Sequence, residues 1–146
     1  MLNYYSIEFI TVEIDKIITI VTGVIKDDWG NILLLKRSGT KTFQGFWQLP
    51  EGKLEKQEQP QNALRREIKE ELNVKIKNLE LTKIKPSALE AQGVRYLALR
   101  IVFNVTLEKN IITLSEEHSE YKWVKPEYAS LLSLLPGTLE VISTEK

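Results

Sequence analysis

Residues 52–74 read GKLEKQEQPQNALRREIKEELNV. The stretch opens with a glycine-containing loop, and the residues from Pro60 to Leu72 are strong helix formers. Proline suits the first helical position, because its missing N–H would have no partner there. Gln59 is a weak N-cap, so the start of the helix is set less firmly than its body. The sequence therefore predicts a loop followed by a helix over residues 60–72.

Three carboxylates share one side of this predicted helix. At about 100° per residue, Glu67, Glu70 and Glu71 fall within a sector of about 100°. No basic residue stands four positions after Glu67 or Glu70, so the three charges repel one another. A solvated acidic face is the ordinary alternative, but the spacing favours a bound cation. The neighbouring stripe is apolar and consists of Leu64, Ile68 and Leu72.

A hard divalent ion is the natural partner for such a trio. Mg²⁺, and Mn²⁺ as the second choice, prefers carboxylate and carbonyl oxygens and commonly bridges a protein to a phosphate. Such an ion lowers the pKa of water and holds a leaving group, while a carboxylate that is not fully used as a ligand can act as general base. The helix therefore predicts phosphoryl chemistry.

Composition narrows the class of protein. Twenty basic and twenty acidic side chains cancel within 146 residues, so no overall field favours a nucleic acid polymer or an anionic membrane. The chain has no cysteine, which excludes disulfides and thiolate chemistry and suits a cytoplasmic location. Charged residues interrupt the apolar N-terminal stretch, so neither a membrane span nor a signal peptide is expected. One domain over residues 1–146 is the default.

The flanking sequence predicts an α/β domain with a mixed sheet. Residues 1–15 read as an N-terminal strand extension, and residues 17–25 and 32–36 as strands that a turn joins into a hairpin. Residues 37–52 read as a loop, and the following strands are expected at about 74–85, at 94–107 and at 121–124. A helix near 127–134 and a short helical tail complete the prediction. In strand 94–107 the expected core face consists of Leu97, Leu99, Ile101, Phe103, Val105 and Leu107.

The opening stretch resembles the signature of the Nudix hydrolases. That signature is Gly, five residues, Glu, seven residues, Arg-Glu, an apolar residue, any residue, Glu-Glu, any residue, Gly and an apolar residue. Asn73 stands where the family has its last Gly, and Asn is the next best residue for a left-handed conformation after a helix. Residues 33–38, 47–50 and 118–124 are similar to family segments as well. The matching positions are Gly52, Glu58, Arg66, Glu67, Ile68, Glu70, Glu71 and Val74.

The resemblance implies a fold and a division of roles. The fold would be a Nudix-like α/β/α sandwich with a mixed β-sheet. Glu67, Glu70 and Glu71 would bind the metal and carry catalysis, with the Gly52 carbonyl as a further ligand. Glu58 and Arg66 would pair to hold the loop against the helix. The family often adds an acidic residue from a distant loop, and we expect Glu120, in preference to Glu116 and Glu117, to fill that metal-binding and catalytic role.

Three further residues are candidates for substrate binding. Arg37 and Lys53 flank the expected cleft and suit phosphate contacts, Arg37 by a two-pronged one, with ordinary surface charge as the alternative. Phe46 suits stacking on a base, although an aromatic residue at a strand end is more often part of a core. His118 is the single histidine, and we expect it to anchor its loop.

The resemblance implies a pyrophosphohydrolase of a nucleoside diphosphate linked to a further group. Within this class we favour a nucleoside triphosphate, an oxidised one included, as the small-molecule substrate. ADP-ribose, a nucleotide sugar or a dinucleoside polyphosphate is the alternative. A non-catalytic nucleotide-sensing module usually loses carboxylates that this chain retains, and RNA cap removal would suit a more basic chain. A homodimer is left open.

Overall fold

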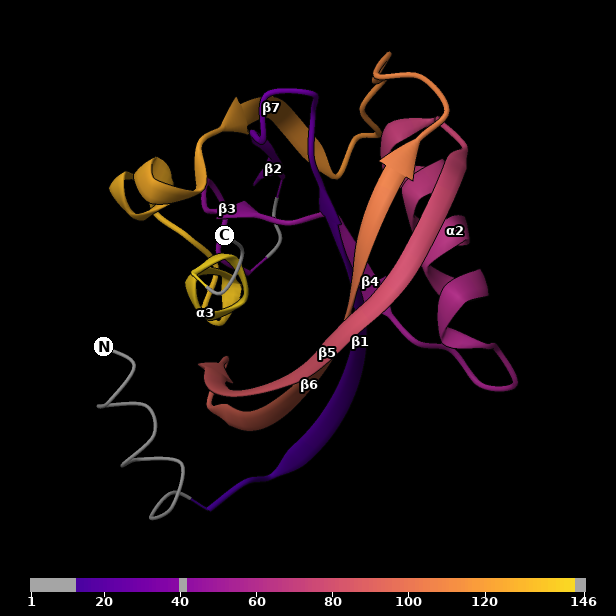
Figure 1. The fold of residues 1–146 in the computed structure, drawn as a ribbon. Coiled ribbons are helices and arrows are strands. Elements are labelled where there is room, and N and C mark those ends of the chain that lie inside the picture. The colour runs from indigo at the N-terminus through magenta and orange to yellow at the C-terminus, as the bar shows by residue number, and fades with distance from the viewer. Residues whose placement is uncertain (1–12, 40–41, 144–146) are drawn as a thin grey trace.

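The computed structural model describes residues 13–39 and 42–143. The described part of the chain begins with four strands, continues with a helix and three more strands, and ends with two short helices (Figure 1). The predicted strand in residues 1–15 lies almost wholly outside the described residues, and residues 13–15 precede the first strand without regular structure. The elements are β1 (Lys16–Ile25), β2 (Ile32–Arg37), β3 (Trp47–Gln48), β4 (Glu51–Lys53), α2 (Pro60–Leu72), β5 (Ile76–Ala91), β6 (Val94–Leu107), β7 (His118–Val124), the 3₁₀ helix η1 (Pro126–Leu131) and α3 (Thr138–Ile142).

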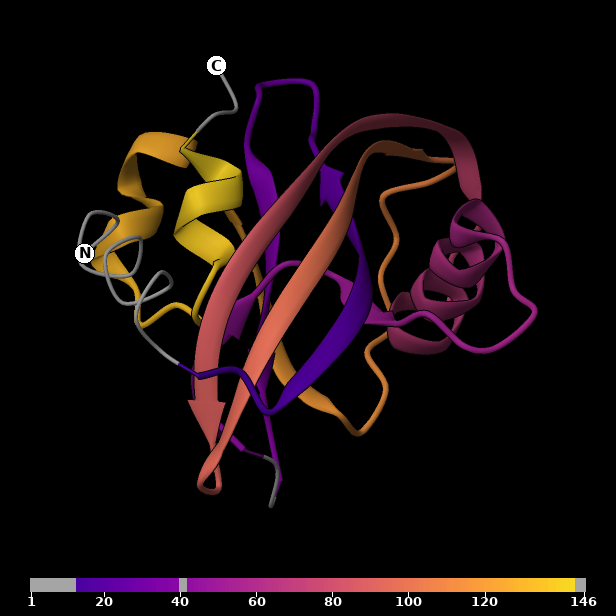
Figure 2. The same cartoon turned by 90° about the horizontal axis from the view of Figure 1, so that it is seen from below.

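The strands form two sheets. The first has the order β4-β1-β6-β5 and is mixed, because β1 runs parallel to β6 while the other neighbours are antiparallel. The second has the order β3-β2-β7 and is antiparallel. Helix α2 lies on one side of the strands, and η1 and α3 lie on the other (Figures 1 and 2). The predicted α/β/α sandwich with a mixed sheet is therefore confirmed.

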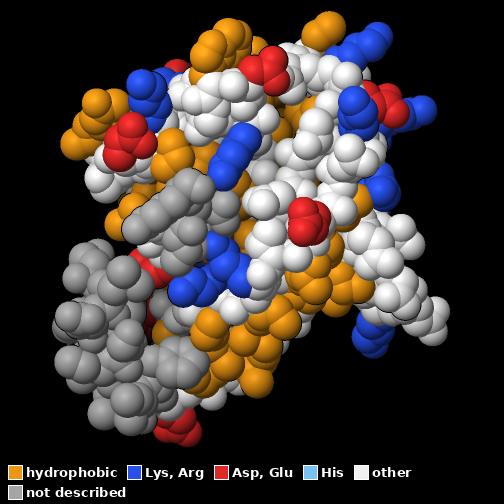
Figure 3. All heavy atoms as spheres, viewed as in Figure 1, with side chains coloured by type: hydrophobic (Ala, Val, Ile, Leu, Met, Phe, Trp, Pro, Cys, Tyr) orange, Lys and Arg blue, Asp and Glu red, His pale blue; other side chains and the backbone are white. Residues whose placement is uncertain are grey.

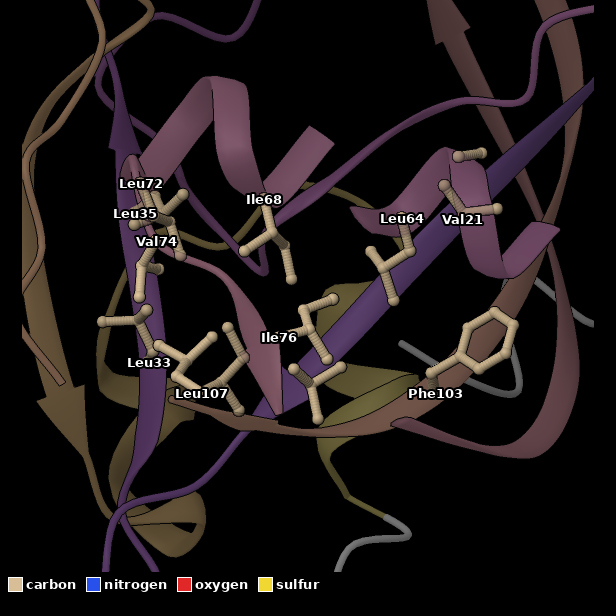
Figure 4. Packing of buried hydrophobic residues seen from close by; sticks show 13 residues of the cluster. Val21, Leu33, Leu35, Leu64, Ile68, Leu72, Val74, Ile76, Phe103 and Leu107 are labelled. Carbon is tan, nitrogen blue, oxygen red and sulfur yellow. The ribbon is translucent and has the colours of Figure 1, made fainter. Parts of the chain in front are cut away.

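Two apolar clusters fill the spaces between the layers. Leu64, Ile68 and Leu72 of α2 point toward the strands, as the stripe predicted (Figure 4). They pack there against β1, β2 and β6. The second cluster joins the opposite faces of these strands to Val141 and Ile142 of α3. Burying both faces of the strands fixes the position of α2 relative to the sheets.

This two-sided burial corrects the expected pattern of β6. Phe103, Val105 and Leu107 are buried on the predicted face. However, Ala98, Arg100 and Val102 on the other face are also buried. The sequence predicted only one core face because alternation is typical of a sheet covered on one side.

Several predicted boundaries need correction. Residues 17–25 and 32–36 are strands joined by a turn, in which Asp27 accepts hydrogen bonds from the N–H groups of Trp29 and Asn31. They are not a regular hairpin, because β1 and β2 enter different sheets. The segment 37–52, predicted as loop, contains β3 and β4, which are too short to show periodicity.

The later elements also differ in extent from the prediction. Strand β5 continues through Pro86 to Ala91, which an edge strand tolerates. Strand β7 begins at His118 rather than at residue 121. A six-residue 3₁₀ helix stands where the sequence predicted a helix near 127–134. Among the described residues, no helix is both long enough and apolar enough to cross a membrane.

Candidate active site

The three carboxylates on helix α2 are buried to different extents. The side chain of Glu71 is 3% exposed, that of Glu67 is 14% exposed, and that of Glu70 is 59% exposed. The cause is the apolar stripe, because burial of Ile68 and Leu72 turns the adjacent Glu71 toward the interior. The trio therefore leads from solvent into the protein.

Glu71 is a buried carboxylate whose negative charge is poorly compensated. Burial raises its pKa well above the ordinary value, and the nearby charges of Glu67, Glu51 and Glu117 raise it further. A backbone hydrogen bond from Glu51 opposes this shift. Among residues 13–39 and 42–143, Oε1 is buried without a hydrogen-bond partner, and Oε2 lies 3.6 Å from His118 Nε2. Such a group calls for a cation.

Arg66 supplies positive charge at the rim of the trio. Its Nε and Nη2 donate to the two carboxylate oxygens of Glu58 over 2.8 and 3.0 Å, so the predicted pair is present. Its Nη1 lies 2.8 Å from Glu67 Oε1 and 3.5 Å from Glu70 Oε2. The prediction from sequence considered only positions four residues after each glutamate. Arg66 stands four residues before Glu70 and directly before Glu67, and it contacts both carboxylates.

The ion pairs of Arg66 shift the acidity of its partners. The hydrogen bond from Arg66 is the main cause of the lowered pKa of Glu58. Burial raises the pKa of Glu67, while Arg66 opposes that shift. Arg66 therefore neutralises Glu58 and part of the charge of Glu67.

Gly52 leaves the Glu67 carboxylate close to the main chain of β4. Gly52 pairs with Val21 of β1, which fixes the strand beneath α2. A Cβ atom at position 52 would overlap the carboxylate of Glu67. Glycine is needed here for space rather than for a left-handed backbone. Its carbonyl as a metal ligand stays a prediction.

The acidic residue that joins Glu71 from a distant segment is Glu117. Ligand atoms of Glu71, Glu117 and His118 lie within 4.8 Å of one another. Glu120 instead stands opposite Lys36 in the β2–β7 pairing and lies 3.8 Å from its Nζ atom. Glu117 stands one residue before β7 and is exposed, whereas Glu120 lies within that strand. The role of Glu120 as a metal ligand stays a prediction.

A groove with a volume of about 270 Å³ adjoins Gly52. Arg37 and Lys53 both line it, as do Phe43 and Tyr96. Phe46 is not among the lining residues, although its ring packs 5.5 Å from that of Phe43. Phe43 is therefore the better candidate for contact with an apolar group.

Arg37 is held in place at this groove. Its Nε donates to the Thr42 carbonyl over 2.8 Å, and its Nη1 donates to Gln48 Oε1 over 2.6 Å. Burial lowers its pKa, while the charges of Glu51, Glu117 and Glu71 oppose that shift. The guanidinium of Arg37 is therefore close enough to these carboxylates to be affected by their charge. Glu67, Glu71 and Glu117 together form the acidic cluster of the site.

Two further residues at the groove were missed by reasoning from sequence. Glu51 and Arg100 form an ion pair with side chains that are 7% and 2% exposed. The available signal was an arginine in the middle of the apolar strand 94–107, since an arginine is almost never fully buried unless it is paired.

The residues of the acidic cluster fit a divalent cation. Glu67, Glu71 and Glu117 supply carboxylate oxygens, which are the donors that Mg²⁺ and Mn²⁺ prefer. Oxygen Oε1 of Glu71 has no hydrogen-bond partner, and Gly52 leaves space where a side chain would intrude. Both observations favour a cation between β4 and α2.

The chain is similar to known proteins over most of its length. Residues 17–143 match the model of a protein family that is described as "NUDIX domain". Nucleoside triphosphatase NudI of Escherichia fergusonii is 31% identical over 135 residues, which span 86% of this chain and 94% of the relative. The Salmonella typhimurium protein of the same name is 32% identical over 134 residues, with the same two coverages.

Solved structures share the fold. The MutT protein from Methanosarcina mazei Go1 superposes with a TM-score of 0.70 at 28% identity, over 89% of this chain and 93% of its own. The NUDIX domain of Shewanella oneidensis NrtR, complexed with ADP ribose, has a TM-score of 0.71 at 16% identity and covers 94% of both chains. The second likeness shows the fold alone.

Proposed function

The chain belongs to the Nudix hydrolase family, and we propose on that premise that it hydrolyses nucleoside triphosphates to a nucleoside monophosphate and pyrophosphate. The observation that carries the proposal is the buried, poorly compensated carboxylate of Glu71, which shares a backbone hydrogen bond with Glu51 at the edge of the groove. The relatives that share 31 and 32% identity are nucleoside triphosphatases, which supports this substrate class over ADP-ribose or a dinucleoside polyphosphate. Oxidised triphosphates belong to the same class.

The cation site would be built from two elements and a loop. Glu67 and Glu71 of α2, the Gly52 carbonyl of β4 and Glu117 would hold Mg²⁺, or Mn²⁺ in its place. When bound there, the ion withdraws charge from the phosphates and offsets the repulsion between the carboxylates. In this proposal Glu117 takes the ligand position that the sequence had assigned to Glu120.

The groove would hold the nucleotide. Arg37 lies with its guanidinium fixed by Thr42 and Gln48, so it can meet a phosphate oxygen with little loss of side-chain freedom. Lys53 lines the same groove beside Gly52 and would contact a second phosphate. Phe43 and Tyr96 supply apolar surface for the nucleoside, in place of the predicted Phe46.

Hydrolysis breaks one phosphoric anhydride bond. Water attacks a phosphorus atom of the triphosphate, a P–O bond forms, and the bridging P–O bond breaks with its electron pair on the departing oxygen. A proton leaves the attacking water for a carboxylate. We assign that step to Glu70, because its side chain is 59% exposed and the two more buried members of the trio, Glu67 and Glu71, would serve as ligands of the cation.

A substrate panel tests the proposal. Purified protein with Mg²⁺ is given nucleoside triphosphates, oxidised triphosphates, ADP-ribose, nucleotide sugars and dinucleoside polyphosphates, and products are separated by ion-exchange chromatography. We expect pyrophosphate from triphosphates and no turnover in EDTA. If the protein hydrolyses ADP-ribose and none of the triphosphates, the proposed substrate class is wrong and ADP-ribose takes its place. Binding without turnover across the panel would indicate a sensing module instead.

Other properties belong to the same proposal. A cytoplasmic location and a small-molecule substrate, rather than a nucleic acid polymer, agree with the balanced charge and the absence of cysteine. Basic and acidic side chains both lie on the face shown in Figure 3.

A further inference from the structure

A buried ion pair lies between the groove and the acidic cluster. Arg100 Nε donates to Glu51 Oε1 over 3.0 Å, and Nη2 donates to Glu51 Oε2 over 3.2 Å. The two parallel contacts form the strongest geometry that arginine offers a carboxylate. Neither residue has a role in the steps proposed above, and both line the groove.

Further hydrogen bonds tie this pair to several elements. Arg100 of β6 also donates to Ser87 Oγ of β5 over 2.9 Å and to the Pro136 carbonyl over 3.1 Å. The hydroxyl of Thr22 in β1 donates to Glu51 Oε1 over 2.9 Å. A Cβ atom at Gly137 would overlap the guanidinium, so the surrounding chain leaves it no room to turn.

Glu51 connects this network to the catalytic carboxylates. Its side chain is held by Arg100, while its backbone forms a hydrogen bond with Glu71. The next residue, Gly52, lies against the carboxylate of Glu67. Strand β4 pairs with β1 over three residues, and one backbone hydrogen bond follows on either side, from Gly23 to Pro50 and from Leu54 to Thr19. So short a strand depends on side-chain contacts to keep its place.

We propose that Glu51 and Arg100 are positioning residues that fix the main chain of β4 against Glu67 and Glu71. The pair thereby sets the place of the Gly52 carbonyl relative to the two carboxylates. This inference rests on the proposed function, because it concerns the same cation site. The bland alternative is a pair that only stabilises the fold.

The test must separate positioning from stability. Removing one partner leaves a charge buried alone and destabilises the protein in either case, whereas replacing both with apolar side chains is often neutral for stability. The informative variant is therefore the double substitution Glu51→Met with Arg100→Met. Arg100→Lys is the second variant, since it keeps the charge and loses the two-pronged contact. Arg65→Met is the control, because it removes an exposed α2 arginine that contacts the Ile76 carbonyl.

Three readouts are measured on the full chain. Mn²⁺ affinity is followed by electron paramagnetic resonance, kcat and KM are measured with a nucleoside triphosphate, and the amide resonance of Gly52 reports the place of β4 without any metal. We expect the folded double variant to bind Mn²⁺ about 10-fold more weakly and to lose about 10-fold in kcat, with a smaller change in KM. Arg100→Lys should change in the same direction, and Arg65→Met should match the wild type.

Two results would overturn the inference. One is a folded double variant whose Gly52 resonance, Mn²⁺ affinity and kcat all match the wild type. If that variant does not fold, an Arg100→Lys protein with an unshifted Gly52 resonance and unchanged Mn²⁺ affinity is the other. A different result would contradict the proposed function, namely a wild-type protein that hydrolyses no triphosphate. In that case the Gly52 resonance still tests whether the ion pair positions β4.

Discussion

At the residue scale, Glu71 combines burial with a charge that the surrounding protein does not balance. Within the described part of the chain its Oε1 atom has no hydrogen-bond partner, and burial, followed by three neighbouring carboxylates, raises its pKa. Evolution of a stable core alone would place an apolar residue here. The retained carboxylate is therefore best explained by a ligand.

The substitution Glu71→Gln should abolish hydrolysis while the protein stays folded. Glutamine keeps the shape of the side chain and removes the charge that a cation needs, so kcat should fall by about 100-fold or more. Pyrophosphate release measures the loss, and circular dichroism checks the fold. Turnover near that of the wild type with Mg²⁺ would show that Glu71 is not a ligand.

The substitution Gly52→Ala should weaken cation binding for a steric reason. The added methyl group would occupy the place of the Glu67 carboxylate, so either β4 or that side chain must move. We expect about 10-fold weaker Mn²⁺ binding, measured by calorimetry. Gly30→Ala is the control at a distant turn: a Cβ atom there meets nothing within 4 Å, and its φ of 81° makes the expected loss one of stability rather than of Mn²⁺ affinity. Equal Mn²⁺ affinity in both variants would contradict the prediction.

At the scale of elements, α2 links the core to the chemistry. One stripe packs on the strands, and the next presents the carboxylates. The helix ends at Asn73, whose φ of 53° lies in the left-handed region, and its N–H donates to the Lys69 carbonyl over 3.0 Å. The predicted conformation for this departure from the family pattern is therefore present.

Asn73→Ala should lower the free energy of unfolding by about 1 kcal/mol, because alanine pays the left-handed penalty without a polar side chain. Asn73→Gly should be neutral or slightly stabilising, since glycine adopts this conformation freely. Urea denaturation measures both variants. Equal stability of the alanine and glycine variants would mean that the backbone leaves the left-handed region.

Ile68→Ala should remove about 3 kcal/mol from the free energy of unfolding, because Ile68 is fully buried between α2 and the strands. A Cβ atom at Gly23 of β1 would lie 3.4 Å from the Cδ1 atom of Ile68, so the two elements are in close contact here. Lys69→Ala, on the exposed side of the helix, is the control for helix propensity. A loss below about 1 kcal/mol for Ile68→Ala would show that the site collapses easily.

Elements with strong local signals could be predicted from sequence, and elements fixed by tertiary pairing could not. Helix α2 and strand β6 have the expected bounds, because proline placement and long apolar alternation are local. Strand β4 has three residues and exists through its pairing with β1, which no local pattern reveals.

The candidate site divides in the same way. Glu67, Glu70 and Glu71 follow from helical spacing, and the Glu58–Arg66 pair follows from the family signature. The approach of Glu117 to Glu71, the contact of Glu120 with Lys36 and the place of Phe43 in the groove depend on how distant segments meet. Those outcomes require the three-dimensional arrangement.

At the scale of the whole molecule, stability should depend on pH through the acidic cluster. A carboxyl group whose pKa is raised by folding favours the protonated, folded state, so Glu71 contributes stability below the ordinary carboxyl pKa. That contribution is lost as the pH rises through the raised value. Glu58 has the opposite sign, because its pKa is lowered and its stabilisation is lost in acid.

In EDTA, Glu71→Gln should therefore raise the melting temperature relative to the wild type at pH 8, and the difference should shrink toward pH 4. Adding Mg²⁺ at pH 8 should reverse the order, because the cation binds the folded wild type alone. Differential scanning fluorimetry at a series of pH values measures both effects. A difference that is constant across pH would show that another group sets the dependence.

The burial of both faces of β6 also disfavours a wrong register in its pairing with β1 and β5. Strand β6 pairs with β1 over ten residues and with β5 along most of its length. A slip of one residue would exchange its faces and carry the guanidinium of Arg100 into the apolar layer beneath α2, away from Glu51. One buried charge thus penalises every such misaligned sheet, so the sequence selects a single alignment during folding.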